Sequence, residues 1–347
     1  AGDDFVGIDT TLSLGFVYNG LANDGVYGTP PAAGYDFFQG PVVPGAPEDE
    51  AHFNFQKLAG WKNLEVSGFA YYINSDPVYQ DPDLGTVEGG QQMYNYLQSK
   101  LYDGQAFVDP TTSEEVKITL AGDPITRTGW IDGIVNAPDD RRMMMVTGPF
   151  TLNKELDLAN GKINRQEVVV ARLIGLGSDR LSSLQVLKYY DRFAQLAFDN
   201  NFDLPNAPPA PKVTAYVKPN TITLSWGEQA GVLATEGHSD AGFNFQGYNV
   251  YQFPGAKSTF QEARRIATFD IVDNIATIFD EVVDEKSGAV VVLPVQFGTD
   301  SGIKRLIEIT NDVITDRPLV NNQPYYFAVT AYAYNDDPEA TPRQLES

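Results

Sequence analysis

The fold of this chain is decided by the stretch SDRLSSLQVLKYYDRFAQLAFDNNF at residues 178–202, which continues directly into DLPNAPPAP at residues 203–211. The first part is the only long helical pattern: polar residues recur at steps of three and four, and apolar residues cover most of the remaining circumference. A helix with so much apolar surface must be covered by other elements. We therefore predict a helix over residues 178–201, capped by Ser178 or Asp179, that packs across a sheet.

The second part of this stretch marks a domain boundary. Its prolines at 205, 208, 209 and 211 cannot continue a helix, and they stiffen the chain toward polyproline II. On either side, short apolar strand patterns alternate with Gly/Pro turns. We predict a mainly β protein: a β-sandwich-like domain with one long helix over 51–203, a Pro-rich linker over 204–211 and a second β-sandwich over 212–347.

Residues 1–50 differ in composition from the rest of the first domain. They are rich in Gly, Pro, Tyr and Phe, and turn signals dominate from Asn19 to Gly45. We predict an extended arm over 1–50 with strand-like patterns only near its start. Chain ends stay loose unless something holds them, so the arm either wraps its own domain or docks on a neighbouring copy.

The strand just before the helix carries the run Val168, Val169 and Val170, within NRQEVVVARLI at residues 164–174. A continuous β-branched run, rather than an alternating one, is typical of a strand that is buried on both faces. We predict such burial here, under the helix that follows.

Charge and composition exclude several classes of partner. The chain has 24 basic and 46 acidic residues, a net charge of −22, which repels nucleic-acid phosphates and anionic membranes. No apolar run is long enough to span a membrane. We expect neither nucleic-acid binding nor membrane insertion. With no cysteine, disulfides and thiolate metal sites are also excluded.

Three strand patterns of the second domain share a family likeness: TITLSW ending at Trp226, a Gly-Tyr-x-Val-Tyr strand from Gly247, and a late strand from Tyr325 that follows Leu319 by six residues. Together they resemble the fibronectin type III module. The resemblance implies that Trp226 fills the core, and that the Tyr325 hydroxyl bonds back to the loop backbone as a tyrosine corner, with Leu319 packed beside it.

This domain is longer than the module that it resembles. The surplus lies in two segments, 227–245 and 272–302, which we expect to form long loops or an added hairpin. Loops on a rigid sandwich often carry binding sites.

The first domain has a likeness of its own, carried by the pieces GDP…TGW, DRRMMM…GPFTL and EVVVARLIGLGSDRLSS. They are similar to a recurring region of large secreted surface proteins of Bacteroidetes-type bacteria, which use the type nine secretion system. The likeness implies an extracellular or cell-surface location, and it transfers no chemistry to named residues. The start AGDD, without Met, favours an N-terminus processed after signal cleavage.

Calcium is the one candidate cofactor, because Asp- and Asn-rich loops supply the oxygen ligands that it prefers. None of these loops fits the EF-hand pattern, so the alternative is that they are solvated turns. The candidate ligands are Asp3, Asp4, Asp9, Asn23, Asp24, Asp81 and Asp83.

We find no catalytic pattern. His238, Ser239 and Asp240 include all residue types of a hydrolytic triad, but neighbours on one loop cannot converge as nucleophile, base and orienting acid. GLGSDR at 175–180 leads from a strand into a helix, yet it lacks the Lys of a phosphate-binding loop. We therefore expect a protein that is not an enzyme.

The sequence as a whole favours an extracellular structural protein that acts through protein–protein contacts. Copies of the chain, or other subunits, would associate by strand addition through the arm and bare strand edges, forming an oligomer or filament. The alternative is an adhesion or glycan-binding module. Its site would lie in the long loops or among exposed tyrosines of the first domain, namely Tyr71, Tyr72, Tyr79, Tyr94 and Tyr96.

Overall fold

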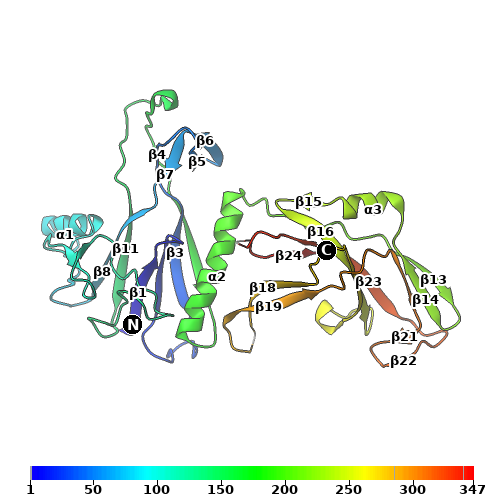
Figure 1. Cartoon of the computed structure of the whole chain (residues 1–347). Helices are drawn as coiled ribbons and strands as arrows, with labels where there is room; N and C mark the ends of the chain where they lie inside the picture. Colours follow the sequence, from blue (N-terminus) through cyan, green and yellow to red (C-terminus); the bar gives the residue numbers. More distant parts are fainter. Residues whose placement is uncertain (1, 285, 339) are drawn as a thin grey trace. The chain divides into compact units, whose positions relative to one another are not determined.

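The computed structural model describes residues 2–284, 286–338 and 340–347 (Figure 1). The chain is mainly β, with antiparallel sheets throughout. It divides into two compact units. The first contains the described residues of Ala1–Asp203 and Val283–Val290, and the second those of Leu204–Val282 and Val291–Ser347. The division at Asp203 coincides with the start of the Pro-rich stretch.

The first unit is built on a four-stranded antiparallel sheet in the order β1-β2-β3-β12. Its strands are β1 (Asp4–Asp9), β2 (Leu14–Asn19), β3 (Ala32–Gln39) and β12 (Val169–Gly175). The long helix α2 (Arg180–Asp199) covers one face of this sheet (Figure 1). Leu14, Phe16 and Tyr18 alternate along β2 and pack against Leu184 and Leu187 of the helix, as the period of two in a strand requires.

The helix begins and ends for local reasons. Asp179 is its N-cap: its carboxylate accepts hydrogen bonds from the N–H groups of Leu181 and Ser182, and Ser182 Oγ accepts from Asp179 N–H in return. This reciprocal capping box satisfies donors that have no partner within the helix. After Asp199 the backbone of Asn201 and Phe202 turns left-handed, with φ values of 52° and 62°, which ends the helix.

The opposite face of the sheet is covered only in part. The pair of strands β8 (Val66–Ile73) and β11 (Arg141–Thr147) packs against Val6 and Ile8 of β1 and Val17 of β2. The smaller elements of this unit are β4 (Val42–Pro44), β5 (Glu50–Phe53), β6 (Gln56–Ala59), β7 (Trp61–Asn63), α1 (Val87–Leu97), β9 (Phe107–Val108), β10 (Glu115–Val116) and η1 (Leu158–Asn160).

The predicted arm is not an arm. Three of the four strands of this sheet, and β4, come from residues 1–50. The reason lies in the glycines. A Cβ on Gly15 would lie 2.6 Å from Met145 Sδ of β11, and one on Gly34 would lie 3.2 Å from Leu187 Cδ2 of α2. These glycines let neighbouring layers approach closely inside strands, whereas the sequence pattern suggested turns.

The second unit is a β-sandwich. One sheet has the order β13-β14-β20. In the other, β16 pairs with β15, β17 and β23, and β24 pairs with β23. The strands are β13 (Thr214–Lys218), β14 (Thr221–Ser225), β20 (Leu306–Ile309), β15 (Ser239–Asp240), β16 (Phe243–Phe253), β17 (Arg264–Asp270), β23 (Tyr326–Tyr334) and β24 (Gln344–Glu346).

Side chains from both sheets meet in one core, as they do in sandwiches generally. Trp226, at the end of β14, is 2% exposed and its ring centroid lies 5.7 Å from that of Tyr248. The Tyr325 hydroxyl accepts a hydrogen bond of 2.8 Å from Val320 N–H, and Leu319 is buried in the same core. These are the positions that the fibronectin type III likeness implied for the three residues.

The two surplus segments form regular structure. The segment 227–245 holds α3 (Gln229–Glu236) and β15, and 272–302 holds the added hairpin of β18 (Thr277–Val283) and β19 (Val290–Phe297). The remaining elements are η2 (Phe260–Glu262), β21 (Asn311–Asp312) and β22 (Arg317–Pro318).

We expect Tyr325→Phe to lower the free energy of unfolding by about 1 kcal/mol, because it removes the acceptor for Val320 N–H without opening a cavity. Urea denaturation followed by tryptophan fluorescence measures this. Tyr216→Phe is the matched control, since Tyr216 is an exposed tyrosine on β13. Equal stability of the two variants would contradict the corner's role.

Candidate functional site

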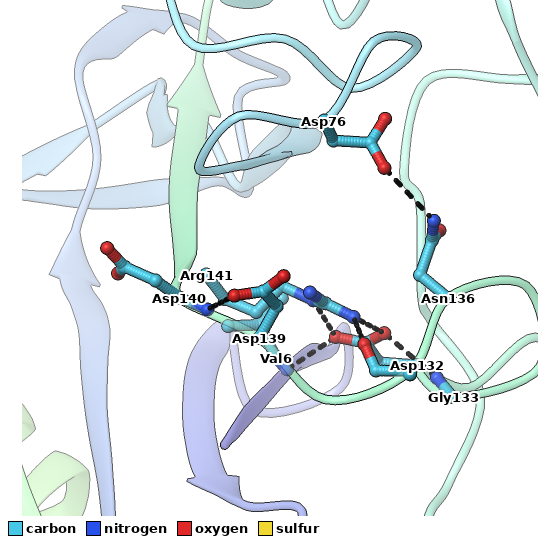
Figure 2. Close-up of polar contacts among 9 residues, drawn as sticks. Val6, Asp76, Asp132, Gly133, Asn136, Asp139, Asp140 and Arg141 are labelled. Carbon is cyan, nitrogen blue, oxygen red and sulfur yellow. Dashed lines mark hydrogen bonds and ion pairs between the residues drawn. The ribbon is translucent and has the colours of Figure 1, made fainter. Parts of the chain in front are cut away.

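One edge of the four-stranded sheet is closed to any further strand. The outward N–H groups of β1 are each satisfied in turn: Asp4 N–H donates to Asp139 O at 3.1 Å, and Ile8 N–H to Leu120 O at 3.2 Å. Between them, Val6 N–H donates to the Asp132 carboxylate at 3.0 Å (Figure 2). An edge whose donors are already paired offers no template for another chain.

Asp132 is held in place by a buried ion pair. Arg141 donates from Nε to Asp132 Oδ2 at 2.9 Å and from Nη2 to Oδ1 at 3.1 Å, and both side chains are almost fully buried (Figure 2). Gly133 N–H also donates to Asp132, and Arg141 Nη2 to Ala137 O. A bidentate pair with these further bonds offsets much of the cost of burying two charges, while Arg141 Nη1 is buried without a hydrogen-bond partner among the described residues. The pair therefore fastens the loop before β11 to the edge of β1.

We expect Asp132→Ala to destabilise the first unit by roughly 3–5 kcal/mol, because it leaves the buried Arg141 guanidinium without its counter-charge. Thermal or urea unfolding measures the loss. Asp139→Ala serves as control, since Asp139 is exposed and closes the edge through its backbone. A loss in Asp132→Ala no larger than in the control would rule out this role.

The opposite edge of the same sheet is open. β12 pairs with β3 on one side, and within the described residues no strand or loop pairs with its other side. Two of its outward side chains are aliphatic, Val170 at 46% and Ile174 at 69% exposed, and the exposed Arg172 lies between them. Val168 and Leu176, just beyond the strand ends, are exposed too. An open edge with apolar side chains is the feature that natural sheets usually avoid.

Neighbouring side chains of β3 extend this apolar surface. Register places Tyr35 beside Arg172 and Phe37 beside Val170, on the face turned away from α2. The Arg172 guanidinium carbon lies 5.7 Å from the centroid of the Tyr35 ring, a cation–π contact. We call Tyr35, Phe37, Val170, Arg172 and Ile174, together with the free edge of β12, the β12 surface.

The prediction of burial on both faces of this strand is therefore wrong. α2 covers the face that holds Leu173, while the pair β8–β11 reaches only the half of the sheet formed by β1 and β2. Val168 and Val170 are both exposed, and register places Val170 on the uncovered face. The run of three valines was a signal for this surface, but the sequence could not show that only one face would be covered.

A second unusual feature is a buried pair of acids between the sheet and the helix. Asp36 of β3 is 0% exposed and Asp191 of α2 is 1% exposed. As ionised carboxylates they find no hydrogen-bond donor among the described residues. Protonation of one acid lets it donate to the other, since the two lie within hydrogen-bonding reach. Sequence reasoning missed this pair, because two isolated aspartates far apart in the chain carry no local signal.

Burial raises the pKa of both acids. The pKa of Asp36 rises to about 7, and the carboxylate of Asp199 adds to the rise. The pKa of Asp191 rises to about 8, with Asp36 and Asp9 adding to the effect of burial and Arg192 opposing it. Desolvation and like charge both disfavour the ionised form. The pair therefore holds a proton near neutral pH.

This pair makes stability depend on pH. An acid whose pKa is higher in the folded chain stabilises the fold when protonated, so its contribution is full below about pH 4 and is lost as pH rises through the folded values of about 7 and 8. We expect Asp36→Asn to be more stable than the natural chain by roughly 1–3 kcal/mol at alkaline pH, with the gain shrinking toward acid pH.

Urea unfolding of Asp36→Asn at a series of pH values measures that gain. Asp203→Asn is the control, since Asp203 is an exposed aspartate near the end of the same helix. A difference from the natural chain that does not change with pH would exclude the buried pair as its cause.

The calcium candidates are not gathered into one site. Asn19 Nδ2 links Asp3 and Asp24, at 2.9 and 3.4 Å from their carboxylates. The others lie apart: Asp9 pairs with Lys188, Asp81 pairs with Arg142, Asp4 lies in β1, and Asn23 and Asp83 are exposed. In the described part of the chain, no three acidic or histidine side chains converge as metal ligands.

The residues considered for a hydrolytic triad, a phosphate-binding loop and a glycan site mostly make contacts within the fold. His238 Nε2 and the Asp240 carboxylate both bind the backbone of Asn206, so neither contacts Ser239 as a triad would. At the start of α2, Gly177 N–H donates to Ser183 Oγ. Among the tyrosines proposed for glycan binding, Tyr71 and Tyr96 are core residues and Tyr72 and Tyr79 pack against them; Tyr94 is exposed.

Comparison of the chain with protein-family models, with curated proteins and with solved structures finds no match. Among the described helices, none is both long and apolar enough to cross a bilayer. Function is therefore inferred from the geometry of the chain itself.

Proposed function

We propose that this chain is an extracellular structural or cell-surface protein that acts through protein–protein contacts, and that the contact is the addition of a partner strand to β12. One observation carries the proposal: the β1 edge of the sheet is closed at Asp4, Val6 and Ile8, whereas the β12 edge is open and apolar. Within one sheet, the outward backbone donors of one edge strand are thus paired and those of the other edge strand are free among the described residues.

An added strand would gain from β12 in two ways. Backbone N–H and C=O groups of the free edge would pair with those of the partner, which is the usual source of affinity in strand addition. Side chains such as Val170 and Ile174 would be removed from water, and full burial of an aliphatic side chain is worth about 1.5–3 kcal/mol. The rigid support of β12 by β3 and α2 keeps the ordering cost of this surface low.

The contact would not use residues 1–50 as an exchanged arm. Because β1, β2 and β3 come from these residues, their transfer to a neighbour would dismantle the sheet that supports β12. Association with another subunit would instead run through the β12 edge.

The extracellular location is supported by the likeness of the first unit to secreted surface proteins of type nine secretion. A net charge of −22 is compatible with that location, since it keeps the chain soluble and away from nucleic acids. An adhesion or glycan-binding role has less support, because most of the tyrosines proposed for it serve the core.

Selection from a displayed library of extended peptides, each of about eight residues, tests strand addition on the full chain. We expect enriched peptides that lose at least about tenfold in affinity against the double variant Val170→Lys/Ile174→Lys, since two aliphatic contacts are removed.

Val217→Lys is the matched control for this selection. Val217 is an exposed valine on β13, an edge strand of the second unit. Enriched peptides should bind Val217→Lys as well as the natural chain. A selection that yields no binders, or only binders indifferent to the β12 variant, would overturn the proposed function. Circular dichroism would verify that each variant remains folded.

A further inference from the structure

We propose that the β12 surface binds an extended segment of another protein in which an acidic residue is flanked, two positions away on each side, by apolar residues. This inference rests on the proposed function and specifies the chemistry of its partner. The central contact is a charge pair between the partner's carboxylate and Arg172.

Arg172 is an exposed cation that keeps no ion pair with any residue the structure describes. Its described contact is the face of the Tyr35 ring, which supports the guanidinium without neutralising it. Arg172 lies between Val170 and Ile174 on the exposed face of β12, so the carboxylate of an added strand can pair with its guanidinium.

The geometry of a β-ladder then sets the pattern of the partner. Residues directly opposite on neighbouring strands have Cβ atoms about 4.5–5.5 Å apart, and side chains of one strand alternate between faces. A carboxylate opposite Arg172 would place the partner's residues at two positions on either side opposite Val170 and Ile174. Both of those side chains are aliphatic and exposed, so apolar partner residues fit there.

A second copy of this chain fits the surface less well. Two antiparallel β12 strands centred on Arg172 would place two guanidinium groups opposite each other, and like charges at such a position are destabilising. A shifted register would set Arg172 against an aliphatic residue of the other copy. Each copy also carries a net charge of −22, which opposes association.

A charge-exchange experiment tests the inference. The probes are two synthetic peptides of about nine residues that alternate Thr with Val, with Glu replacing the central Val in one peptide and Lys in the other. Binding to the full chain is measured by fluorescence anisotropy. We expect the natural chain to prefer the Glu peptide by between about twofold and tenfold, from one cross-strand charge pair.

In Arg172→Glu the preference should reverse, and it should weaken with added salt in both proteins, since exposed charge pairs are screened. Arg165→Glu is the matched control: it makes the same change in charge at another exposed arginine, whose guanidinium carbon lies 5.4 Å from the Phe53 ring centroid. This control should keep the preference of the natural chain.

The possible failures can be told apart. Equal binding of both peptides, abolished by Val170→Lys/Ile174→Lys, would overturn the acidic partner but leave strand addition intact. Absence of binding by either peptide would count against both the inference and the proposed function. Self-association of the natural chain in sedimentation velocity, lost in the same double variant, would make a second copy the occupant and overturn the inference.

Discussion

The first unit depends on the packing of α2 against one face of its sheet. Leu184 and Leu187 lie against Leu14 and Phe16, and Gly34 makes the close approach between the layers possible. With one face covered by the helix, the other face needs its own cover. The pair β8–β11 supplies this cover over β1 and β2 only. The half formed by β3 and β12 remains exposed, and the candidate interaction surface is a consequence of this incomplete second layer.

The same unit buries charge in two opposite ways. Asp132 and Arg141 form a bidentate pair with further backbone bonds, which offset much of the cost of burying the two charges and let Asp132 close the β1 edge. Asp36 and Asp191 are like acids without such donors in the described structure, so their burial is tolerated only with a shared proton. The Asp132–Arg141 pair holds a loop against β1. The Asp36–Asp191 pair makes the packing of α2 on β3 depend on protonation of an acid.

The second unit shows how a sandwich can be recognised from few positions. A helix or strand pattern alone does not require an aromatic residue at Trp226 or Tyr325. Both positions could be recognised from the sequence because each is a large aromatic residue at a characteristic point of a strand. The surplus segments were visible as excess length. The sequence left long loops or an added hairpin as alternatives, and the structure has the β18–β19 hairpin in one segment and α3, which no local pattern had indicated, in the other.

The sequence by itself determined the elements whose signals are local. A helix over 178–201, a cap at Ser178 or Asp179 and a boundary at the Pro-rich stretch all follow from periodicity and backbone chemistry within a few residues, and the structure has the helix over Arg180–Asp199 with Asp179 as its cap. Only the tertiary structure decided which faces are covered. Val168 and Val170 are exposed, Gly15 and Gly34 are packing positions, and Asp36 lies beside Asp191, because each outcome depends on a layer contributed from far along the chain. Periodicity tells which side chains share a face, but not what lies opposite that face.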